Sequence, residues 1–221
     1  MKILITAQEL KQNMQRYVIV DVRSHEDYLA GHVRGAVNIA LGRYALKSSE
    51  HGLILEADFA QLMSSVGVCD THDIVVYDDG TTSGAVSRFW LVAKHYGHVG
   101  SVFILDGGYS ACKILPQDTF EASLDATNYI TNKTDGYFYT KEQIIENRDK
   151  IVLLDVRSFE EYVGDELRGN PRGGHLHGCK FLTADSFMQL KNPMASFAAV
   201  YDVVAYMNEL GIKKEDTVVA Y

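Results

Sequence analysis

The segment "VIVDVRSHEDYLAGHVRGAVN", residues 18–38, occurs a second time in this chain, and this repetition decides the fold. The second copy reads "VLLDVRSFEEYVGDELRGNPRGGHLHGCK", residues 152–180, and carries an insertion from Asp165 to about Gly173. Outside the insertion, both copies keep the same order of apolar, acidic and basic residues. A repeat of this length indicates two copies of one structural unit.

Two further matches flank this segment in the same order. Upstream, "ITAQEL" (5–10) corresponds to "YTKEQI" (139–144). Downstream, "VGVCDTHDIVVY" (66–77) corresponds without a gap to "LGIKKEDTVVAY" (210–221). Three collinear matches predict two copies of one domain, with the second copy cut short.

Each copy has the pattern of an α/β domain. Short runs rich in Val, Ile and Leu at 17–22, 73–78, 101–108 and 151–156 are typical of strands buried on both faces. Helical spacing of apolar residues lies between them, and strands that alternate with helices predict a mainly parallel sheet flanked by helices. The predicted helical positions are Phe59, Leu62, Met63 and Val66, then 87–97, and in the second copy Phe197, Val200, Val204, Met207 and Leu210, before Gly211.

The polar, non-periodic stretch 119–136 separates the two copies. We therefore expect a first domain at 1–118, a linker at 119–136 and a second, incomplete domain at 137–221. The expected fold class is α/β, with two tandem domains.

Composition limits the classes of partner and compartment. The chain has 221 residues, 47% of them hydrophobic, and a net charge of −8, which argues against nucleic acid or an anionic membrane as the partner. No apolar run approaches the roughly 20 residues that span a bilayer, and the N-terminus does not resemble a signal peptide. Cys69, Cys112 and Cys179 are widely spaced, without a CxxC pair, so we expect reduced thiols, a cytoplasmic protein and no metal site.

In an open parallel sheet, ligands bind beyond the carboxyl ends of the strands. In the first copy the candidate binding loop is therefore "DDGTTSGAVSR" (78–88). Backbone N–H groups in such a loop and the N-terminus of the following helix stabilise an anion or a thiolate. The loop begins with Asp78, which is no sulfur nucleophile and repels an anion. We expect Asp78 to cap the loop or the helix that follows.

Together, "DVRSHEDYLAGHVRGAVNI", "VVYDDG…SRFWLVAKHYGH…VFILDGGY" and "LLDVRSFEEY…GGHLHGC" resemble the tandem-domain rhodaneses, the thiosulfate and 3-mercaptopyruvate sulfurtransferases. The resemblance implies two rhodanese-like domains, with the N-terminal one inactive. It also implies that a cysteine directly after the "VVxY" strand of the C-terminal domain takes sulfur from the donor as a persulfide. That cysteine passes the sulfur to cyanide or a thiol, so no metal or organic cofactor is expected.

The repeat gives this cysteine an expected position. Tyr221 corresponds to Tyr77, so the position after Tyr221 corresponds to Asp78 and, by the resemblance, to the catalytic cysteine. We therefore expect no catalytic residue within the chain itself and no sulfur transfer by the 221-residue chain. The donor, the acceptor and the oligomeric state stay open.

The resemblance also suggests substrate-binding residues. Arg168 and Arg172 lie in the insertion of the second copy, where family arginines bind the sulfonate or carboxylate of the donor. The family often has an arginine where this chain has Glu161. His51 matches a family histidine that faces the cleft, although the prolines usual beside it are missing here.

Other repeated residues favour structural roles. The pairs Asp21–Arg23 and Asp155–Arg157 end equivalent strands in both copies, so we expect ion pairs that tie loops. His32 and His175 are expected to be hydrogen-bonded turn residues, and the three cysteines to be small, mostly buried structural thiols.

Two other functions remain open. A non-catalytic rhodanese-homology protein would have Asp, Ser or Gly after Tyr221 and would bind a partner or an anion. A phosphatase relative of the same fold would have a loop one residue longer after the cysteine. The sequence that follows codon 221 distinguishes all three.

Overall fold

The computed structural model describes residues 2–41, 53–80, 84–191, 194–197 and 200–221. The chain divides into two compact units. The first unit contains residues 1–137 and 191–196, and the second contains 138–190 and 197–221. Each unit has its own parallel sheet, as the repeat predicts.

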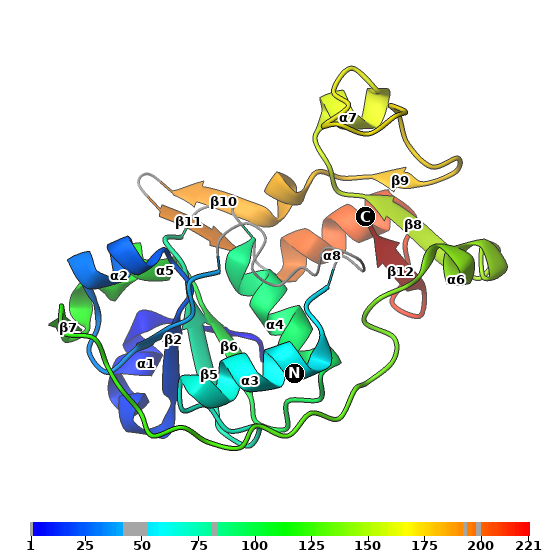
Figure 1. Ribbon diagram of the computed structural model, residues 1–221. Coiled ribbons are helices and arrows are strands. Elements are labelled where there is room, and N and C mark those ends of the chain that lie inside the picture. Colours follow the sequence, from blue (N-terminus) through cyan, green and yellow to red (C-terminus); the bar gives the residue numbers. More distant parts are fainter. Residues whose placement is uncertain (1, 42–52, 81–83, 192–193, 198–199) are drawn as a thin grey trace. The chain divides into compact units, whose positions relative to one another are not determined.

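The first unit is built on a five-stranded sheet with the order β1-β6-β5-β2-β4 (Figure 1). Every pair of neighbours in it is parallel. Its strands are β1 (Leu4–Ile5), β2 (Val18–Asp21), β4 (Val37–Asn38), β5 (Ile74–Tyr77) and β6 (Val102–Leu105), while β3 (His32–Val33) pairs separately with β7 (Gln117–Asp118). Its helices are α1 (Ala7–Asn13), α2 (His25–Ala30), α3 (Glu56–Ser65), α4 (Ala85–His95) and α5 (Gly108–Ala111), with 3-10 turns at Met14–Arg16 and Cys112–Ile114.

The central strands are buried on both faces, which explains why they read as continuous apolar runs. All four residues of β5 are buried. Ile19, Val75 and Tyr77 share a core cluster with Leu10 of α1 and with Cys112. Thr6 caps α1, because its side chain accepts from the Glu9 N–H while the Glu9 carboxylate accepts from the Thr6 N–H.

The second unit repeats this plan over fewer elements. Its sheet has the order β12-β8-β9, and both pairs are parallel. Thr140 caps the first helix of this unit with the same reciprocal pair of bonds that Thr6 makes. The elements are α6 (Lys141–Glu146), β8 (Ile151–Asp155), α7 (Phe159–Val163), β9 (Lys180–Phe181), a 3-10 turn at Ala184–Phe187, α8 (Val200–Glu209) and β12 (Thr217–Ala220).

One predicted helix position is wrong. Phe197 lies in a strand, because Met188–Lys191 (β10) and Met194–Phe197 (β11) form a two-stranded sheet. The helix α8 begins only at Val200. Apolar spacing alone does not separate a short strand from the first turn of a helix.

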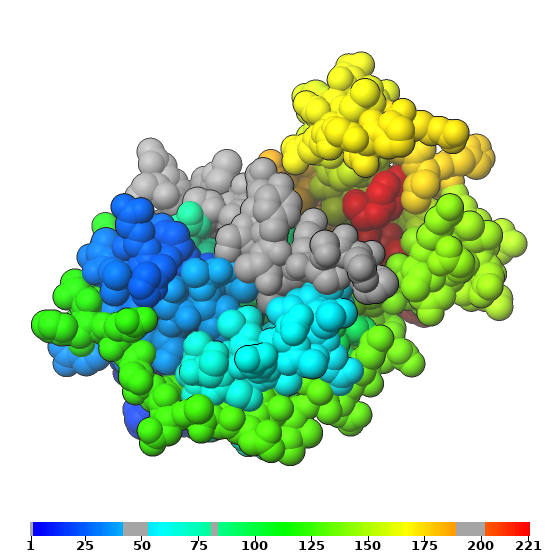
Figure 2. Space-filling view, in the orientation of Figure 1, coloured from blue at the N-terminus to red at the C-terminus, as the bar shows by residue number. Residues whose placement is uncertain are grey.

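Residues 119–136, called the strap below, contain no helix or strand but are bonded to the first unit. Thr127 N–H donates to Ser64 O, Asn132 N–H to Tyr96 O and Thr134 N–H to His95 O. The ring of Tyr129 packs edge-on against Phe59 of α3, with centroids 5.6 Å apart. In Figure 2 the strap forms a green band beside the cyan residues of α3. The segment is therefore part of the surface of the first unit.

Candidate functional site

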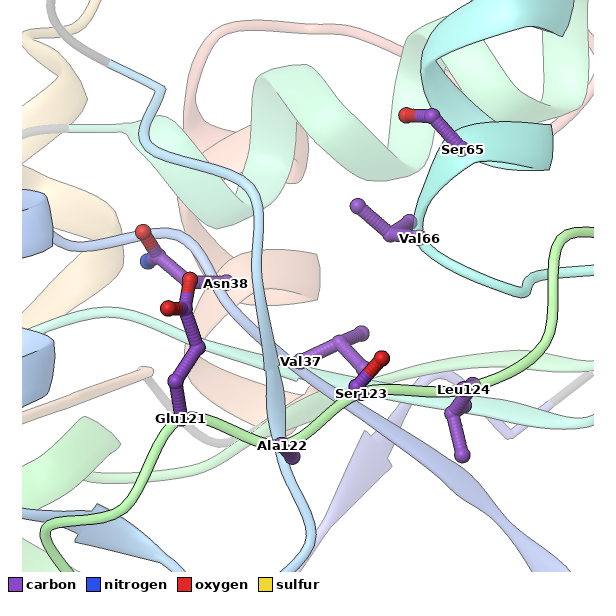
Figure 3. Close-up of a pocket in the computed structure, with 8 residues that line it drawn as sticks. All are labelled: Val37, Asn38, Ser65, Val66, Glu121, Ala122, Ser123 and Leu124. Atoms are coloured by element: carbon purple, nitrogen blue, oxygen red, sulfur yellow. The ribbon is translucent and has the colours of Figure 1, made fainter.

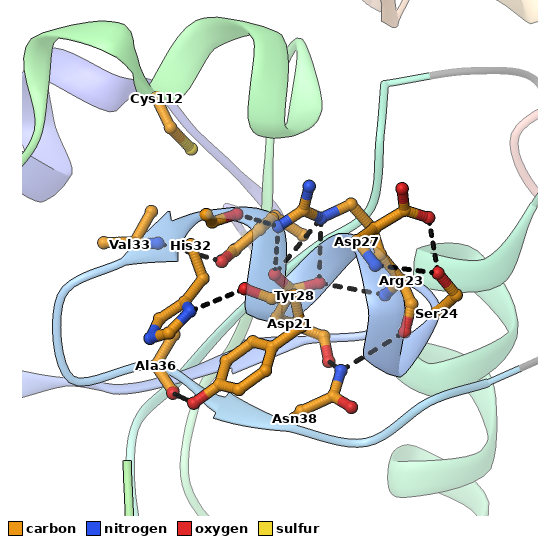
Figure 4. Close-up of polar contacts among 12 residues, drawn as sticks. Asp21, Arg23, Ser24, Asp27, Tyr28, His32, Val33, Ala36, Asn38 and Cys112 are labelled. Atoms are coloured by element: carbon orange, nitrogen blue, oxygen red, sulfur yellow. Dashed lines mark hydrogen bonds and ion pairs between the residues drawn. The ribbon is translucent and has the colours of Figure 1, made fainter. Parts of the chain in front are cut away.

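The carboxyl ends of β2 and β5 carry a buried ionic network (Figure 4). Asp21 is fully buried at the end of β2, and Arg23 Nη2 donates to its Oδ2 at 2.6 Å and to Gly31 O at 2.7 Å. The Arg23 guanidinium also lies 3.7 Å from the centre of the Tyr109 ring. Burial alone would lower the pKa of Arg23, but the hydrogen bond and charge of Asp21 outweigh it and raise that pKa. The pair therefore ties β2 to the neighbouring loops, as predicted.

Asp78 follows β5 and is buried, with 4% of its surface exposed. Its Oδ1 accepts from the Gly80 N–H at 2.9 Å, and its carbonyl accepts from the Tyr109 N–H at 2.7 Å. The Asp78 side chain thus caps its own loop, which confirms that expectation.

A cavity of about 160 Å³ lies beside Asp78. The carboxylates of Asp27, Asp78 and Asp79 line it together with Arg23. Its described lining contains no cysteine. Three acidic residues against one arginine give the described lining a net negative charge, which disfavours an anionic ligand.

The second unit has the same network at the same positions. Arg157 Nη2 donates to Asp155 Oδ2 at 2.6 Å and to Gly174 O at 2.8 Å. Burial raises the pKa of Asp155, but the hydrogen bonds that its carboxylate accepts from Arg157 outweigh this effect and lower it. This confirms the second predicted loop tie.

The register of the strands equates Tyr221 with Tyr77. Val18 pairs with Ile74 in the first unit. Their counterparts in the repeat, Val152 and Val218, pair in the second unit. In each unit the carbonyl of this tyrosine accepts an N–H bond at 3.0 Å, from Val22 to Tyr77 and from Val156 to Tyr221.

The tyrosine hydroxyls agree with this register. Tyr77 OH accepts from Val33 N–H at 3.1 Å, and Tyr221 OH accepts from Leu176 N–H at 2.9 Å. Burial raises the pKa of both tyrosines, so both hydroxyls stay protonated at neutral pH. Tyr221 is therefore the structural counterpart of Tyr77.

Both repeated histidines have the predicted structural role. His32 stacks on Tyr28 with centroids 3.8 Å apart, and its Nδ1 lies 2.8 Å from Tyr28 O. His175 stacks on Tyr162 at 3.9 Å, and its Nδ1 lies 2.9 Å from Tyr162 O.

The structure describes two of the three predicted substrate residues, Arg168 and Arg172. The Arg168 guanidinium bonds to Glu161, with Nε 3.2 Å from Oε2, so it is held by the residue that stands where the family often has an arginine. Arg172 is exposed, and His51 lies outside the described residues. The binding roles of all three stay predictions.

The cysteines differ in environment. Cys112 is fully buried, and burial raises the pKa of its thiol to about 12, so it is an unreactive core residue. Cys69 and Cys179 are partly buried, and their expected structural role stays a prediction. Cys179 accepts a hydrogen bond from Tyr221 OH at 3.2 Å. Sequence reasoning missed this contact, because it joins residues far apart in the chain.

Among the described residues, no group of three His, Cys, Asp or Glu side chains is placed to hold a metal ion. Within the same residues, no helix has the length and hydrophobicity needed to cross a membrane.

Comparison with known proteins gives consistent results. Residues 6–114 match the family model described as a rhodanese-like domain. Over 245 residues the chain is 25% identical to the sulfur carrier protein TtuD of Thermus thermophilus, covering all of this chain and 82% of TtuD. It is 29% identical over 180 residues to the thiosulfate sulfurtransferase of Bos taurus, covering 74% of this chain and 60% of that protein.

A solved structure shares the fold. The crystal structure of SseA from Escherichia coli, described as a 3-mercaptopyruvate sulfotransferase with the rhodanese fold, superposes with a TM-score of 0.84. The sequences are 19% identical, and the match covers all of this chain and 88% of that one. The α/β fold, with parallel sheets flanked by helices, is therefore confirmed.

Proposed function

Residues 6–114 are a rhodanese-like domain, and from this premise we propose that the chain is the scaffold of a sulfurtransferase whose nucleophile is a cysteine directly after Tyr221. The substrates would be a small anionic sulfur donor, thiosulfate or 3-mercaptopyruvate, and a thiophilic acceptor such as cyanide or a thiol. The observation that carries the proposal is the equivalence of β5 and β12. Tyr221 stands at the carboxyl end of β12 as Tyr77 stands at the carboxyl end of β5, directly before Asp78, and this supports the proposed position of the cysteine.

The reaction would proceed in two balanced steps. The thiolate attacks the outer sulfur of thiosulfate, and the S–S bond breaks with its electron pair leaving on sulfite. The enzyme then holds Cys–S–S⁻. Cyanide attacks the terminal sulfur, thiocyanate leaves and the thiolate is restored. With 3-mercaptopyruvate the first leaving product, after protonation, is pyruvate.

Residues of the second unit would hold this cysteine in place and bind the donor. Arg157 and Asp155 hold the end of β12, because Arg157 bonds to Asp155 while its guanidinium lies 5.3 Å from the centre of the Tyr221 ring. Arg172 and Arg168 are proposed to bind the donor anion. Arg168 would first have to leave Glu161, so Arg172 is the better candidate.

Thiocyanate formation tests the proposal. The 221-residue chain should form none above a no-enzyme control, with either thiosulfate or 3-mercaptopyruvate. A form that carries the proposed cysteine directly after Tyr221 should form it, and replacement of that cysteine by Ser should abolish it. Transfer by the 221-residue chain would contradict the proposal. A residue other than Cys at position 222 would instead favour a non-catalytic binding protein.

A further inference from the structure

A second cavity lies in the first unit, in a region that the sulfurtransferase proposal does not use. Its volume is about 310 Å³, the lower end of the range for small-molecule sites. It shares no lining residue with the cavity beside Asp78. It is enclosed by the edge strand β4, the C-terminal end of α3 and the strap, through Val37, Asn38, Ser65, Val66, Glu121, Ala122, Ser123 and Leu124 (Figure 3).

The backbone around this cavity has unused hydrogen-bonding groups. Ile39 N–H donates to Asp21 O, and Asp21 is the register partner of Asn38. In a parallel pair this geometry directs the N–H and C=O of Asn38 itself away from β2, towards the open edge of β4. Within the described part of the chain, no hydrogen bond involves the backbone of Ser123 or Leu124.

The side chains divide into an acidic side and an apolar side. In Figure 3 the Glu121 carboxylate and the Asn38 amide lie on one side of the cavity, and Ser65 and Val66 lie on the other. Among the described lining residues, Glu121 is the one with a charged side chain. Val37, Val66 and Leu124 supply apolar surface.

This chemistry selects one class of ligand. The Glu121 carboxylate repels an anion, and a single carboxylate is too few for a calcium or magnesium ion. A quaternary ammonium is recognised by aromatic faces, and the part of the lining that the structure describes has no aromatic side chain. A primary ammonium has three N–H donors for the Glu121 carboxylate, the backbone carbonyl of Asn38 and the Ser123 hydroxyl, and its carbon chain fits the apolar wall.

We propose that this cavity binds a primary ammonium group carried on a short apolar chain. The group belongs either to a free alkylamine or to a lysine side chain of a peptide, since both present the same NH₃⁺ on methylene groups. The site is independent of sulfur transfer, because its ligand is a cation and both sulfur donors are anions.

Titration of the 15N-labelled 221-residue protein with n-butylammonium tests the proposal. We expect saturable amide shift changes at Val66, Ala122 and Ser123. Butyrate and n-butanol, which keep the carbon chain but lack the ammonium, should cause no saturable change there. N-acetyl-lysine amide tests the second source. Saturation by n-butylammonium alone indicates a free amine, whereas tighter binding of the lysine compound indicates a peptide.

Three variants separate this site from diffuse attraction to an acidic protein. Glu121→Gln should weaken n-butylammonium binding by about tenfold or more, because a charge-assisted bond is lost. Ser123→Phe should abolish binding by filling the cavity. Asp125→Asn removes a charge from the same strap outside the lining and should change the affinity by less than about twofold.

Thermal unfolding of each variant checks that the fold is intact. No saturable shift with n-butylammonium would overturn the proposal. Equal loss of affinity in Asp125→Asn and Glu121→Gln would also overturn it, as would equal binding of butyrate.

Discussion

The guanidinium of Arg157 lies 5.3 Å from the centre of the Tyr221 ring, while its Nη2 is bonded to the buried carboxylate of Asp155. One side chain thus joins the ends of the two neighbouring strands β8 and β12. The first unit has the same arrangement, with Arg23 5.7 Å from the centre of the Tyr77 ring. The loop that follows Tyr77 therefore starts from a fixed point.

Arg157→Ala should destabilise the second unit by about 2–3 kcal/mol, because it leaves the buried Asp155 carboxylate without its charged partner. Urea unfolding followed by circular dichroism measures this change. The matched control is Arg168→Ala, which removes a 57% exposed arginine from the ion pair with Glu161 and should cost less than about 1 kcal/mol. Equal effects of the two variants would refute the proposed role of Arg157 as a loop tie.

His98 should make the stability of the first unit depend on pH. Burial lowers the pKa of His98 to about 4, and the neutral ring is bonded to Tyr129 OH and to His72 O. A histidine with a depressed pKa binds its proton in the unfolded state first. Its contribution is therefore complete above about pH 6.5 and falls as the pH drops from 6.5 towards 4, by up to about 3 kcal/mol.

Urea unfolding followed by Trp90 fluorescence, from pH 7.5 to pH 4.5, checks this dependence. His98→Gln should lower the stability at pH 7.5 and flatten the profile, while His177→Gln, at an exposed histidine, should leave it unchanged. An unflattened profile in His98→Gln would assign the pH dependence to other groups.

Gly97→Ala should loosen the strap. Gly97 has φ +75°, and a Cβ at this position would lie within van der Waals overlap of the Asn132 carbonyl. Limited proteolysis should then cut within 119–136 faster than in the unmodified protein. Gly136→Ala imposes the same kind of backbone strain at φ +95° with nothing within 4 Å of the new Cβ, so only steric displacement distinguishes the two variants. Equal cleavage rates would show that the contact with Asn132 does not hold the strap.

Asp78→Cys should not convert the first unit into a sulfurtransferase. The new thiol would share the cavity of about 160 Å³ with Asp27 and Asp79, and nearby negative charge raises the pKa of a thiol. Its rate of alkylation by iodoacetamide should stay low at pH 7 and rise only above pH 8.5. Rapid alkylation at pH 7 would show that the loop amides outweigh the carboxylates.

The sequence predicted the strands and their register well, because buried parallel strands leave a strong apolar signal and the repeat aligns them. The repeat equates Tyr77 with Tyr221, and both hydroxyls accept a backbone N–H from an equivalent loop. Periodicity was misleading at Phe197, where a short strand and a helix start share the same apolar spacing.

Contacts between distant polar residues were beyond prediction. The stacking of Arg23 on Tyr109 depends on the close approach of two loops, and no local pattern marks it. The attachment of the strap was missed for a similar reason. Its bonds to Ser64, His95 and Tyr96 use backbone groups, which every residue has, and so they leave no trace in composition.

The attachment of the strap decides where the two copies can be separated. A fragment that stops at residue 118 would lack Tyr129, which packs against Phe59 of α3 and is hydrogen-bonded to His98. The Phe59 ring and the His98 imidazole would then be exposed to solvent. A fragment that runs to Tyr137 keeps these partners. The unit that can be expressed or recombined on its own therefore consists of the sheet, its helices and the strap that packs against α3.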